Sequence, residues 1–118
     1  MKKEYIVKKN YEFQDIIKTG NIIKSKTHFL YYKENNIDKN RVGISVGKKL
    51  CNAVYRNLYK RQTRAILNSF FLTLDYQKTY DFVLIIRANF LNTAFLEKQT
   101  SVKNSFNKIN NNNNKQKG

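Results

Sequence analysis

The sequence predicts an α/β sandwich, in which one sheet of about four strands carries helices in the chain order α-β-β-β-α-β-α. Two observations indicate strands: clean alternation of apolar and other residues over 41–46, and a near-continuous apolar run over 80–86. The third observation is a long amphipathic segment over 52–71, between them. This order makes a βαβ unit, whose two strands run parallel. The 118 residues fit one domain of this kind.

The first third of the chain is expected to form a helix and two strands. Residues 10–18 predict a short helix, with Asn10 as its N-cap and Gly20 directly after its end. Two strands follow over 21–26 and 28–33, and the second is rich in aromatic residues. Polar residues then predict a turn before the next strand.

The second half supplies the longest helix, the most apolar strand and a last helix. Asn52 is placed to cap the long amphipathic helix, and the run over 80–86 is apolar enough to be covered on both faces. Apolar residues recur at helical spacing over 92–109. The folded domain is therefore expected to cover 1–109, followed by a low-complexity, disordered tail over 110–118.

The charge balance narrows the class of partner. Lys and Arg number 23 against 8 Asp and Glu, which gives a formal net charge of +15. Such an excess repels itself and favours a polyanionic partner. The single cysteine, Cys51, excludes an intramolecular disulfide framework and suits a reducing, cytoplasmic setting. No apolar run is long enough to predict a secretory signal or a membrane span, so no membrane partner is expected.

Much of the positive charge concentrates on the long helix. From Lys39 to Leu74 the chain carries eight basic residues and no acidic one. At 100° per residue, one helix face is cationic and polar, and it comprises Arg56, Asn57, Lys60, Arg61 and Arg64. The opposite arc is expected to be apolar, and it comprises Val54, Tyr55, Leu58, Tyr59, Ala65, Ile66, Phe70 and Leu72. The forked arginine side chains suit phosphate contacts, and a merely solvated helix face is the alternative.

Lys48 and Lys49 lie between the strand over 41–46 and this helix. Together with backbone N–H groups at the helix start, they can hold a phosphate. The glycine pattern of a nucleotide-binding P-loop is absent, so Gly47 does not predict a nucleotide site. An ordinary polar loop is the alternative interpretation of this segment.

One long motif resembles a known family. Residues 41–64 read R-V-G-I-S-V-G-K-K-L-C-N-A-V-Y-R-N-L-Y-K-R-Q-T-R, which resembles the signature of the bacterial ribonuclease P protein subunit. Two flanking stretches are also similar to that family, namely K-K-N-Y-E-F over 8–13 and Y-D-F-V-L-I-I-R over 80–87. The resemblance covers residues 8 to about 109, and the central motif is long and specific.

This resemblance implies a fold, a partner and a reaction. The family fold is an α-β sandwich whose β-α-β crossover is left-handed, against the usual right-handed rule. The protein would join a catalytic RNA subunit, and together they would remove the 5′ leader from precursor tRNA. The RNA would hold the Mg²⁺ ions and perform the hydrolysis, so no catalytic residue, metal ligand or small-molecule cofactor is expected in this chain.

The resemblance also implies which residues make contacts. RNA contacts carry over to Lys48, Lys49, Arg56, Asn57, Lys60, Arg61 and Arg64. A cleft for the single-stranded leader carries over to Phe13, Ile17 and Tyr31, where bases would stack on the aromatic rings. Core packing is the alternative for Phe13, and a half-buried sheet position is the alternative for Tyr31.

Four positions depart from the family pattern. Leu58 replaces an arginine, so one charge contact is expected to be lost. Cys51 replaces a glycine, which argues against a left-handed backbone conformation there. Ile17 replaces a phenylalanine, so one leader contact becomes weaker or purely apolar. Gly47 replaces a common serine.

No active site carried by the protein itself is visible in the sequence. His28 is the only histidine, and we expect it to be packed or on the surface rather than a general base. The eight carboxylates are scattered, which argues against a metal cluster. Two other functions stay open beside the ribonuclease P subunit. One is a non-enzymatic RNA-binding ribosomal or assembly protein of similar fold, and the other is a DNA-binding protein that places the long helix in the major groove.

Overall fold

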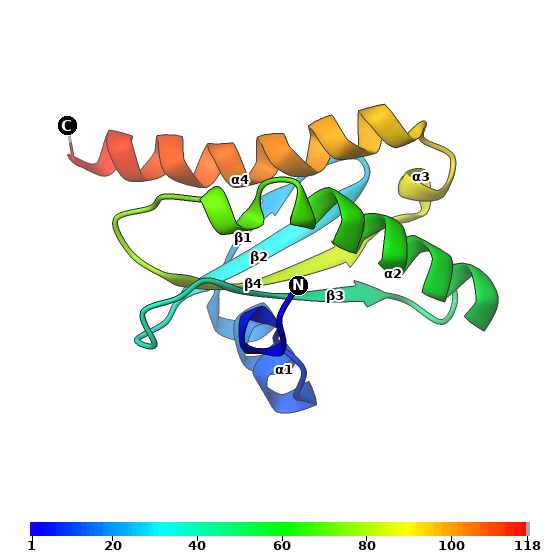
Figure 1. Ribbon diagram of the computed structural model, residues 1–118, viewed down its shortest axis with the longest axis horizontal. Helices are drawn as coiled ribbons and strands as arrows, with labels where there is room; N and C mark the ends of the chain where they lie inside the picture. Colours follow the sequence, from blue (N-terminus) through cyan, green and yellow to red (C-terminus); the bar gives the residue numbers. More distant parts are fainter. Residues whose placement is uncertain (118) are drawn as a thin grey trace.

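A four-stranded sheet forms the centre of the molecule (Figure 1), and its strand order is β1-β2-β4-β3. The computed structural model describes the backbone of residues 1–117 and the side chains of residues 1–109. The strands are β1 (Asn21–Lys24), β2 (His28–Glu34), β3 (Arg41–Val46) and β4 (Tyr80–Ile86). The bounds predicted for β3 and β4 are confirmed, and so is the mixed α/β fold class.

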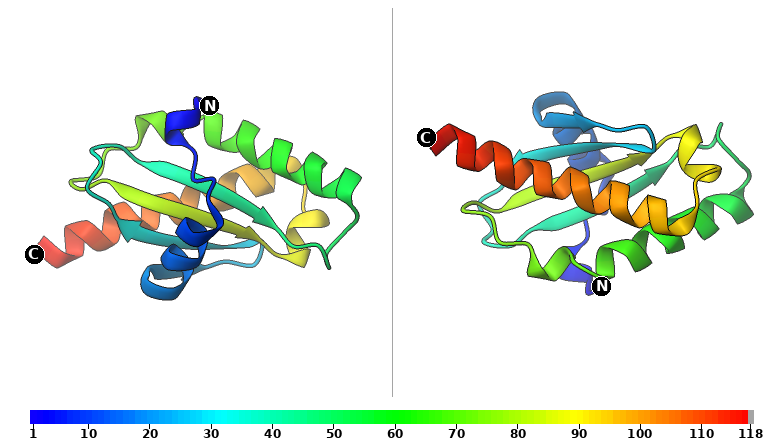
Figure 2. Two further views of the ribbon diagram at one scale, coloured as in Figure 1. Left: turned by 90° about the horizontal axis from the view of Figure 1, so that it is seen from below. Right: turned by 90° about the horizontal axis from the view of Figure 1, so that it is seen from above.

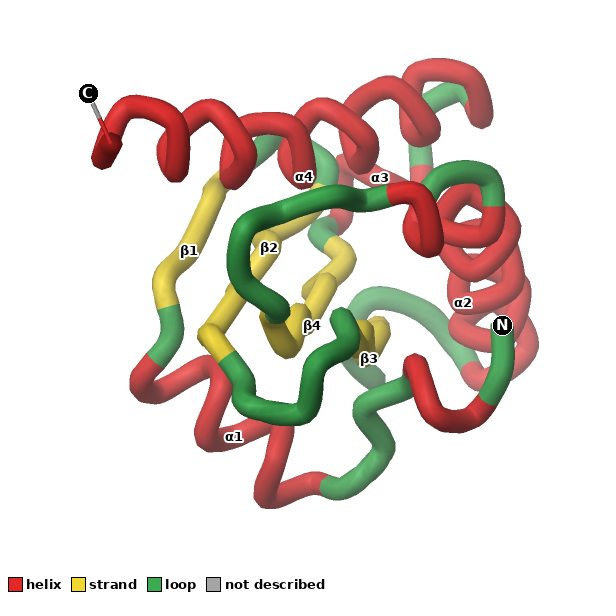
Figure 3. The backbone as a smooth tube through the Cα atoms, turned by 60° about the vertical axis from the view of Figure 1, so that its left-hand side comes forward, coloured by secondary structure: helices red, strands yellow, loops and turns green. Residues whose placement is uncertain are grey.

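Helices cover both faces of the sheet (Figures 1 and 3). The long ones are α1 (Asn10–Thr19), α2 (Ala53–Asn68) and α4 (Phe95–Lys117), and the short ones are η1 (Lys3–Tyr5), η2 (Phe71–Thr73) and α3 (Ala88–Leu91). The pictures show α4 across one face, α2 beside the β3 edge, and α1 alone on the opposite face. The face that carries α1 is therefore the less covered one, and we call it the open face.

The strands β3 and β4 pair in parallel, with Val42 opposite Phe82, as the βαβ pattern predicted. The chain passes through α2 between them, and the left-handed sense of this crossover stays a prediction from the resemblance. The other two pairings are antiparallel. The N-terminal segment extends the β3 edge, because Ile6 forms an isolated parallel bridge with Val42 and Val7 N–H donates to Val42 O at 3.1 Å.

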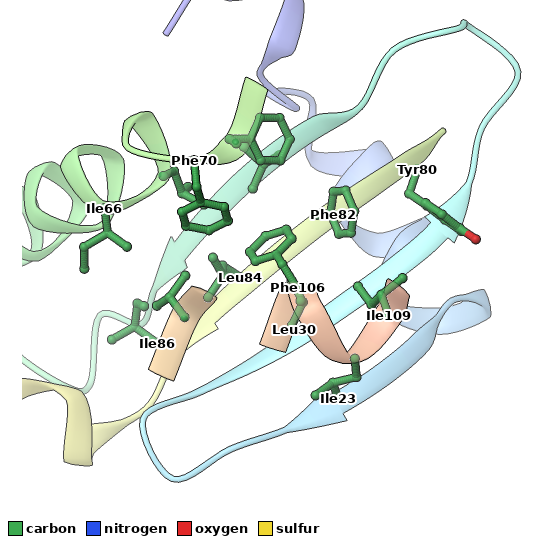
Figure 4. Packing of buried hydrophobic residues seen from close by; sticks show 14 of the residues in the cluster. Ile23, Leu30, Ile66, Phe70, Tyr80, Phe82, Leu84, Ile86, Phe106 and Ile109 are labelled. Atoms are coloured by element: carbon green, nitrogen blue, oxygen red, sulfur yellow. The ribbon is translucent and has the colours of Figure 1, made fainter. Parts of the chain in front are cut away.

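The main core lies between the sheet and α4 (Figure 4). Alternate β4 residues, Phe82 and Leu84 among them, point toward it, and both are fully buried. Phe106 of α4 packs against Phe82 with ring centroids 4.8 Å apart. Val83 points to the other face and is also fully buried, so the prediction that β4 is covered on both faces is confirmed there.

Several predicted element ends were wrong. Asn10 is not an N-cap: Lys9 holds that position, and its side chain makes no capping hydrogen bond. The strand β1 ends at Lys24 because a tight turn follows, in which Ser25 N–H donates to His28 O at 3.0 Å. The helix α2 ends at Asn68, before a separate 3₁₀ turn.

The last helix also differs from its predicted range. It begins at Phe95, three residues after the predicted start at Asn92, because the short helix α3 and a turn precede it. Its backbone continues as helix to Lys117, past the predicted end at Ile109. The side chains of 110–117 and residue 118 lie outside the described residues, where the disordered tail stays a prediction.

His28 is buried beneath α4 and is not a surface group. Its Nδ1 lies 2.8 Å from Thr27 Oγ1, and its Nε2 contacts Ser105 Oγ on α4. Burial, with a smaller contribution from the charge of Lys108, lowers the pKa of His28 to about 4. The residue is therefore neutral near pH 7, and it ties the β1–β2 turn to α4.

Candidate nucleic-acid interface

The basic helix α2 is capped as predicted, but it is rotated relative to the predicted faces. Asn52 Oδ1 accepts from Tyr55 N–H at 3.1 Å, which closes the first turn. The predicted apolar residues Val54 and Tyr55 are 75% and 51% exposed, so the predicted apolar arc was wrong at these two positions. The residues that α2 buries are Thr63, Ile66 and Leu67.

The rotation has a local cause. Thr63 is polar, yet it is fully buried, because its hydroxyl donates to Tyr59 O one turn earlier at 2.8 Å. With its polar atom satisfied inside the helix, Thr63 behaves as a small apolar residue against the core. The inward stripe therefore centres between Tyr59 and Ile66, and it lies closer to the cationic residues than the helical projection predicted.

The rotation leaves the cationic residues around one edge of α2. Asn57, Arg61 and Arg64 are exposed, whereas Arg56 and Lys60 are half-buried. None of the ion pairs among the described side chains involves a basic residue of α2, so this charge is not neutralised within residues 1–109. Such a surface suits an external polyanion.

The loop before α2 adds to the same end of the molecule. Lys48 and Lys49 are both exposed in the turn that joins β3 to α2. Arg56 closes this loop, because its Nη1 donates to Cys51 O at 3.2 Å. Asp38 is the one non-glycine residue with a positive φ in the part of the chain that the structure describes, so Cys51 has an ordinary backbone conformation. The cysteine fits here without strain, although the family has glycine.

A groove of about 530 Å³ lies between α2, the β3 edge and the N-terminal segment. Apolar residues of β3 form part of its lining, among them Ile44. Lys60 and Arg64, four residues apart on α2, supply positive charge, and Phe13 of α1 adds an aromatic ring. The structure therefore brings together residues that the resemblance assigned to RNA contacts and to the leader cleft.

Phe13 stands on the sheet because β3 has a glycine beneath it. A Cβ atom added to Gly43 would fall on the Phe13 ring, with Cε1 and Cε2 3.0 Å away and Cζ closer still. Glycine is therefore required by close approach, not by an unusual backbone angle. The ring is half-buried, so the alternative of pure core packing does not describe it.

The other two predicted cleft residues lie on the same open face. Ile17 and Tyr31 are half-buried and pack, with Phe13, against a small cluster that includes Ile16 and Val83. All three predicted cleft residues therefore share one surface, as the resemblance implied. Whether they contact a leader is a separate question, which the packing alone does not answer.

An ion-pair network that the sequence did not predict fixes α1 on this surface. Arg41 Nη2 lies 2.7 Å from Asp81 Oδ2 and 3.0 Å from Glu12 Oε2, and all three side chains are mostly buried. The hydrogen bonds to Asp81 dominate in raising the pKa of Arg41 above its usual range. Glu12 precedes Phe13 in α1, so the network anchors the turn that carries the groove's ring. The Y-D sequence at 80–81 was a signal that could have pointed to it.

Comparisons with known proteins agree with this geometry. A family model described as Ribonuclease P matches residues 1–110. The chain belongs to the ribonuclease P protein family. The ribonuclease P protein component of Mycoplasma mobile is 42% identical over 111 residues, which cover 94% of this chain and 95% of that protein.

Solved structures of this family have the same fold. The Staphylococcus aureus RNase P protein is 35% identical and superposes with a TM-score of 0.74, over 85% of this chain and 90% of that one. The RNase P protein from Thermotoga maritima is 26% identical with a TM-score of 0.71, over 80% and 88% of the two chains. No helix among the described residues is both long and apolar enough to cross a membrane.

Proposed function

We propose that this chain is the protein component of a ribonuclease P holoenzyme, which removes the 5′ leader from precursor tRNA in the cytoplasm. One observation carries the proposal beyond family membership. Phe13 lines the same groove as Lys60 and Arg64, so a single RNA strand could stack a base on the ring and place its phosphates on the cations. Separate aromatic and basic surfaces would not favour a single-stranded ligand in this way.

In this proposal the chain binds RNA and does not perform the chemistry. Within the described residues, no group of three or more His, Cys, Asp or Glu side chains could hold a metal ion. The chain's own residues therefore do not fit a Mg²⁺ site, and we derive no step through a metal held by the protein. We assign Mg²⁺ and the hydrolytic centre to the catalytic RNA partner, as the resemblance implied.

The division of labour follows from the positions of the side chains. The exposed loop lysines and the α2 cations would neutralise phosphates of the catalytic RNA. The open sheet face would grip the unpaired leader, which adds affinity for precursor tRNA over mature tRNA. Neither role requires a general acid or base, and His28 is unsuited to one because it is buried with both ring nitrogens in contact with hydroxyl groups.

Reconstitution tests the proposed function directly. The chain is mixed with its cognate RNA, Mg²⁺ and a precursor tRNA at physiological salt, and 5′ cleavage is compared with that of the RNA alone. We expect the chain to increase correct cleavage and to tighten binding of precursor tRNA more than of mature tRNA. No effect on either would refute the proposal. Co-purification of ribosomal RNA, in place of one dominant non-ribosomal RNA, would favour the ribosomal or assembly protein.

A further inference from the structure

One end of the open face extends beyond α1. Tyr31 and Val83 pair across β2 and β4, and they belong to the cluster on which α1 packs. Phe29 and Ile85 form the pair two residues along each strand, so their side chains lie on the same face. Both are half-buried. Figure 2 (left) shows that α1 and the segment before it cross the middle of this face and leave the strand ends near α3 uncovered.

A cation is held over the exposed aromatic ring at this end. The guanidinium carbon of Arg87 lies 4.6 Å from the centroid of the Phe29 ring. Arg87 Nη1 donates to Ser25 O at 2.9 Å, and Arg87 N–H donates to Thr27 O at 2.9 Å. The side chain is nevertheless exposed. A planar guanidinium that is already positioned loses little conformational freedom when a further flat group stacks on it.

The charges on the open face differ from one end to the other. At the α1 end, the carboxylates of Glu12, Asp15 and Asp81 pair with basic side chains of the strands. At the other end, the charged strand residue beside Phe29 is Lys24, which is basic and exposed, and Arg87 follows β4. No carboxylate belongs to the last two residue pairs of β2 and β4 here. An anionic strand is therefore attracted to this end.

We infer that Arg87 and Phe29 form a stacking position for one additional unpaired nucleotide of the precursor tRNA leader, next to the position at Tyr31. The base would stack on the guanidinium plane, which Phe29 supports from below, and the adjoining phosphate would lie near Lys24. This inference rests on the proposed function, because it extends the same leader surface by one position.

The spacing permits one strand to occupy both positions. Tyr31 and Phe29 are two residues apart on β2, so their side chains stand about 7 Å apart on one face. Aromatic and guanidinium planes accept any base, so the position would add affinity without selecting a sequence. Its signature is therefore a dependence on leader length and not on leader sequence.

A leader-length series in the reconstituted holoenzyme tests the inference. Precursor tRNAs whose leaders grow by one nucleotide at a time are bound to holoenzymes containing the wild-type chain, Arg87→Ala or Arg87→Lys. Tyr11→Ala is the matched control, because Tyr11 is 68% exposed and also carries a cation over its ring, that of Lys9, but lies on α1. Thermal unfolding of each variant shows that it is folded.

We expect one step of the affinity gain to disappear in Arg87→Ala, a loss of about 5- to 150-fold confined to leaders long enough to reach it. Arg87→Lys should lose part of the same step, because it keeps the charge but not the plane. Tyr11→Ala should follow the wild type.

Two results would overturn the inference alone. If Arg87→Ala binds every leader as the wild type does, the position does not exist. If it weakens all substrates equally, mature tRNA included, Arg87 contacts the catalytic RNA or the tRNA body instead. If the wild-type chain itself shows no leader dependence, the inference fails together with the proposed leader grip, which distinguishes the two failures.

Discussion

Acid should destabilise this fold through a single buried histidine. His28 is fully buried between β2 and α4, where both ring nitrogens contact hydroxyl groups and burial lowers its pKa to about 4. In the unfolded chain the same imidazole titrates near 6.5. Between these two values the unfolded state binds more protons than the folded state, so the free energy of unfolding decreases as the pH falls.

The size of the effect follows from the two pKa values. The contribution of His28 is constant above its unfolded pKa of 6.5 and declines as the pH falls toward about 4. Relative to neutral pH, the loss is about 1 kcal/mol at about pH 5.5 and about 3 kcal/mol once the folded-state histidine is also protonated. For a domain of this size, the full loss is a large part of the total stability.

Urea unfolding measures this loss directly. The wild-type chain and His28→Gln are compared at about pH 7.5 and about pH 5.5, because glutamine keeps hydrogen-bonding atoms but does not titrate in this range. We expect the wild type to lose about 1 kcal/mol more than the variant between the two conditions. Titrating carboxylates affect both proteins alike and cancel in the comparison. Equal losses in the two proteins would refute the assignment of a lowered pKa to His28.

Three further predictions concern the groove and the open face. The pair Lys60→Ala with Arg64→Ala should make the slope of log affinity for RNA against log salt shallower by about 1.4 to 1.8, whereas Lys103→Ala on the exposed side of α4 should leave it nearly unchanged; an unchanged slope in the double variant would remove α2 from the interface. Tyr31→Ala should weaken binding of precursor tRNA by about 5- to 150-fold and of mature tRNA far less, and equal weakening would exclude a leader contact. Gly43→Ala should displace the aromatic ring above it, cost about 1–3 kcal/mol in urea unfolding and lower the preference for precursor tRNA; an unchanged free energy of unfolding and preference would show that the ring relaxes freely.

The sequence predicted the elements best where burial imposes a strict period. The strands β3 and β4 have the predicted bounds, because a strand inside a sheet must alternate or be apolar throughout. The ends of helices were predicted less well. The helix α2 ends at Asn68, where Ser69 Oγ donates to Ile66 O at 2.6 Å and a 3₁₀ turn follows, yet apolar residues continue beyond it. Periodicity alone does not detect such a local hydrogen bond.

The composition of the site was predicted better than its shape. The motif named the cations of α2, but the groove also needs Ile6 and Ile44, which no local spacing connects with Lys60. Their proximity depends on the parallel bridge between the N-terminal segment and the β3 edge, a contact between residues far apart in sequence. The same holds for the network of Arg41, which joins α1, β3 and β4. Long-range packing of this kind becomes visible only when the strands are placed.

The position of Leu58 shows why the departure from the family motif leaves the groove intact. Successive residues on a helix are separated by 100°, so Leu58 points about 160° away from Lys60 and about 120° away from Arg64. Leu58 is half-buried, and it is not among the residues that line the groove. An arginine at this position would therefore add charge to another side of α2, where it would contact a different part of an RNA partner. The motif thus serves two surfaces, and this chain keeps the one that combines with Phe13.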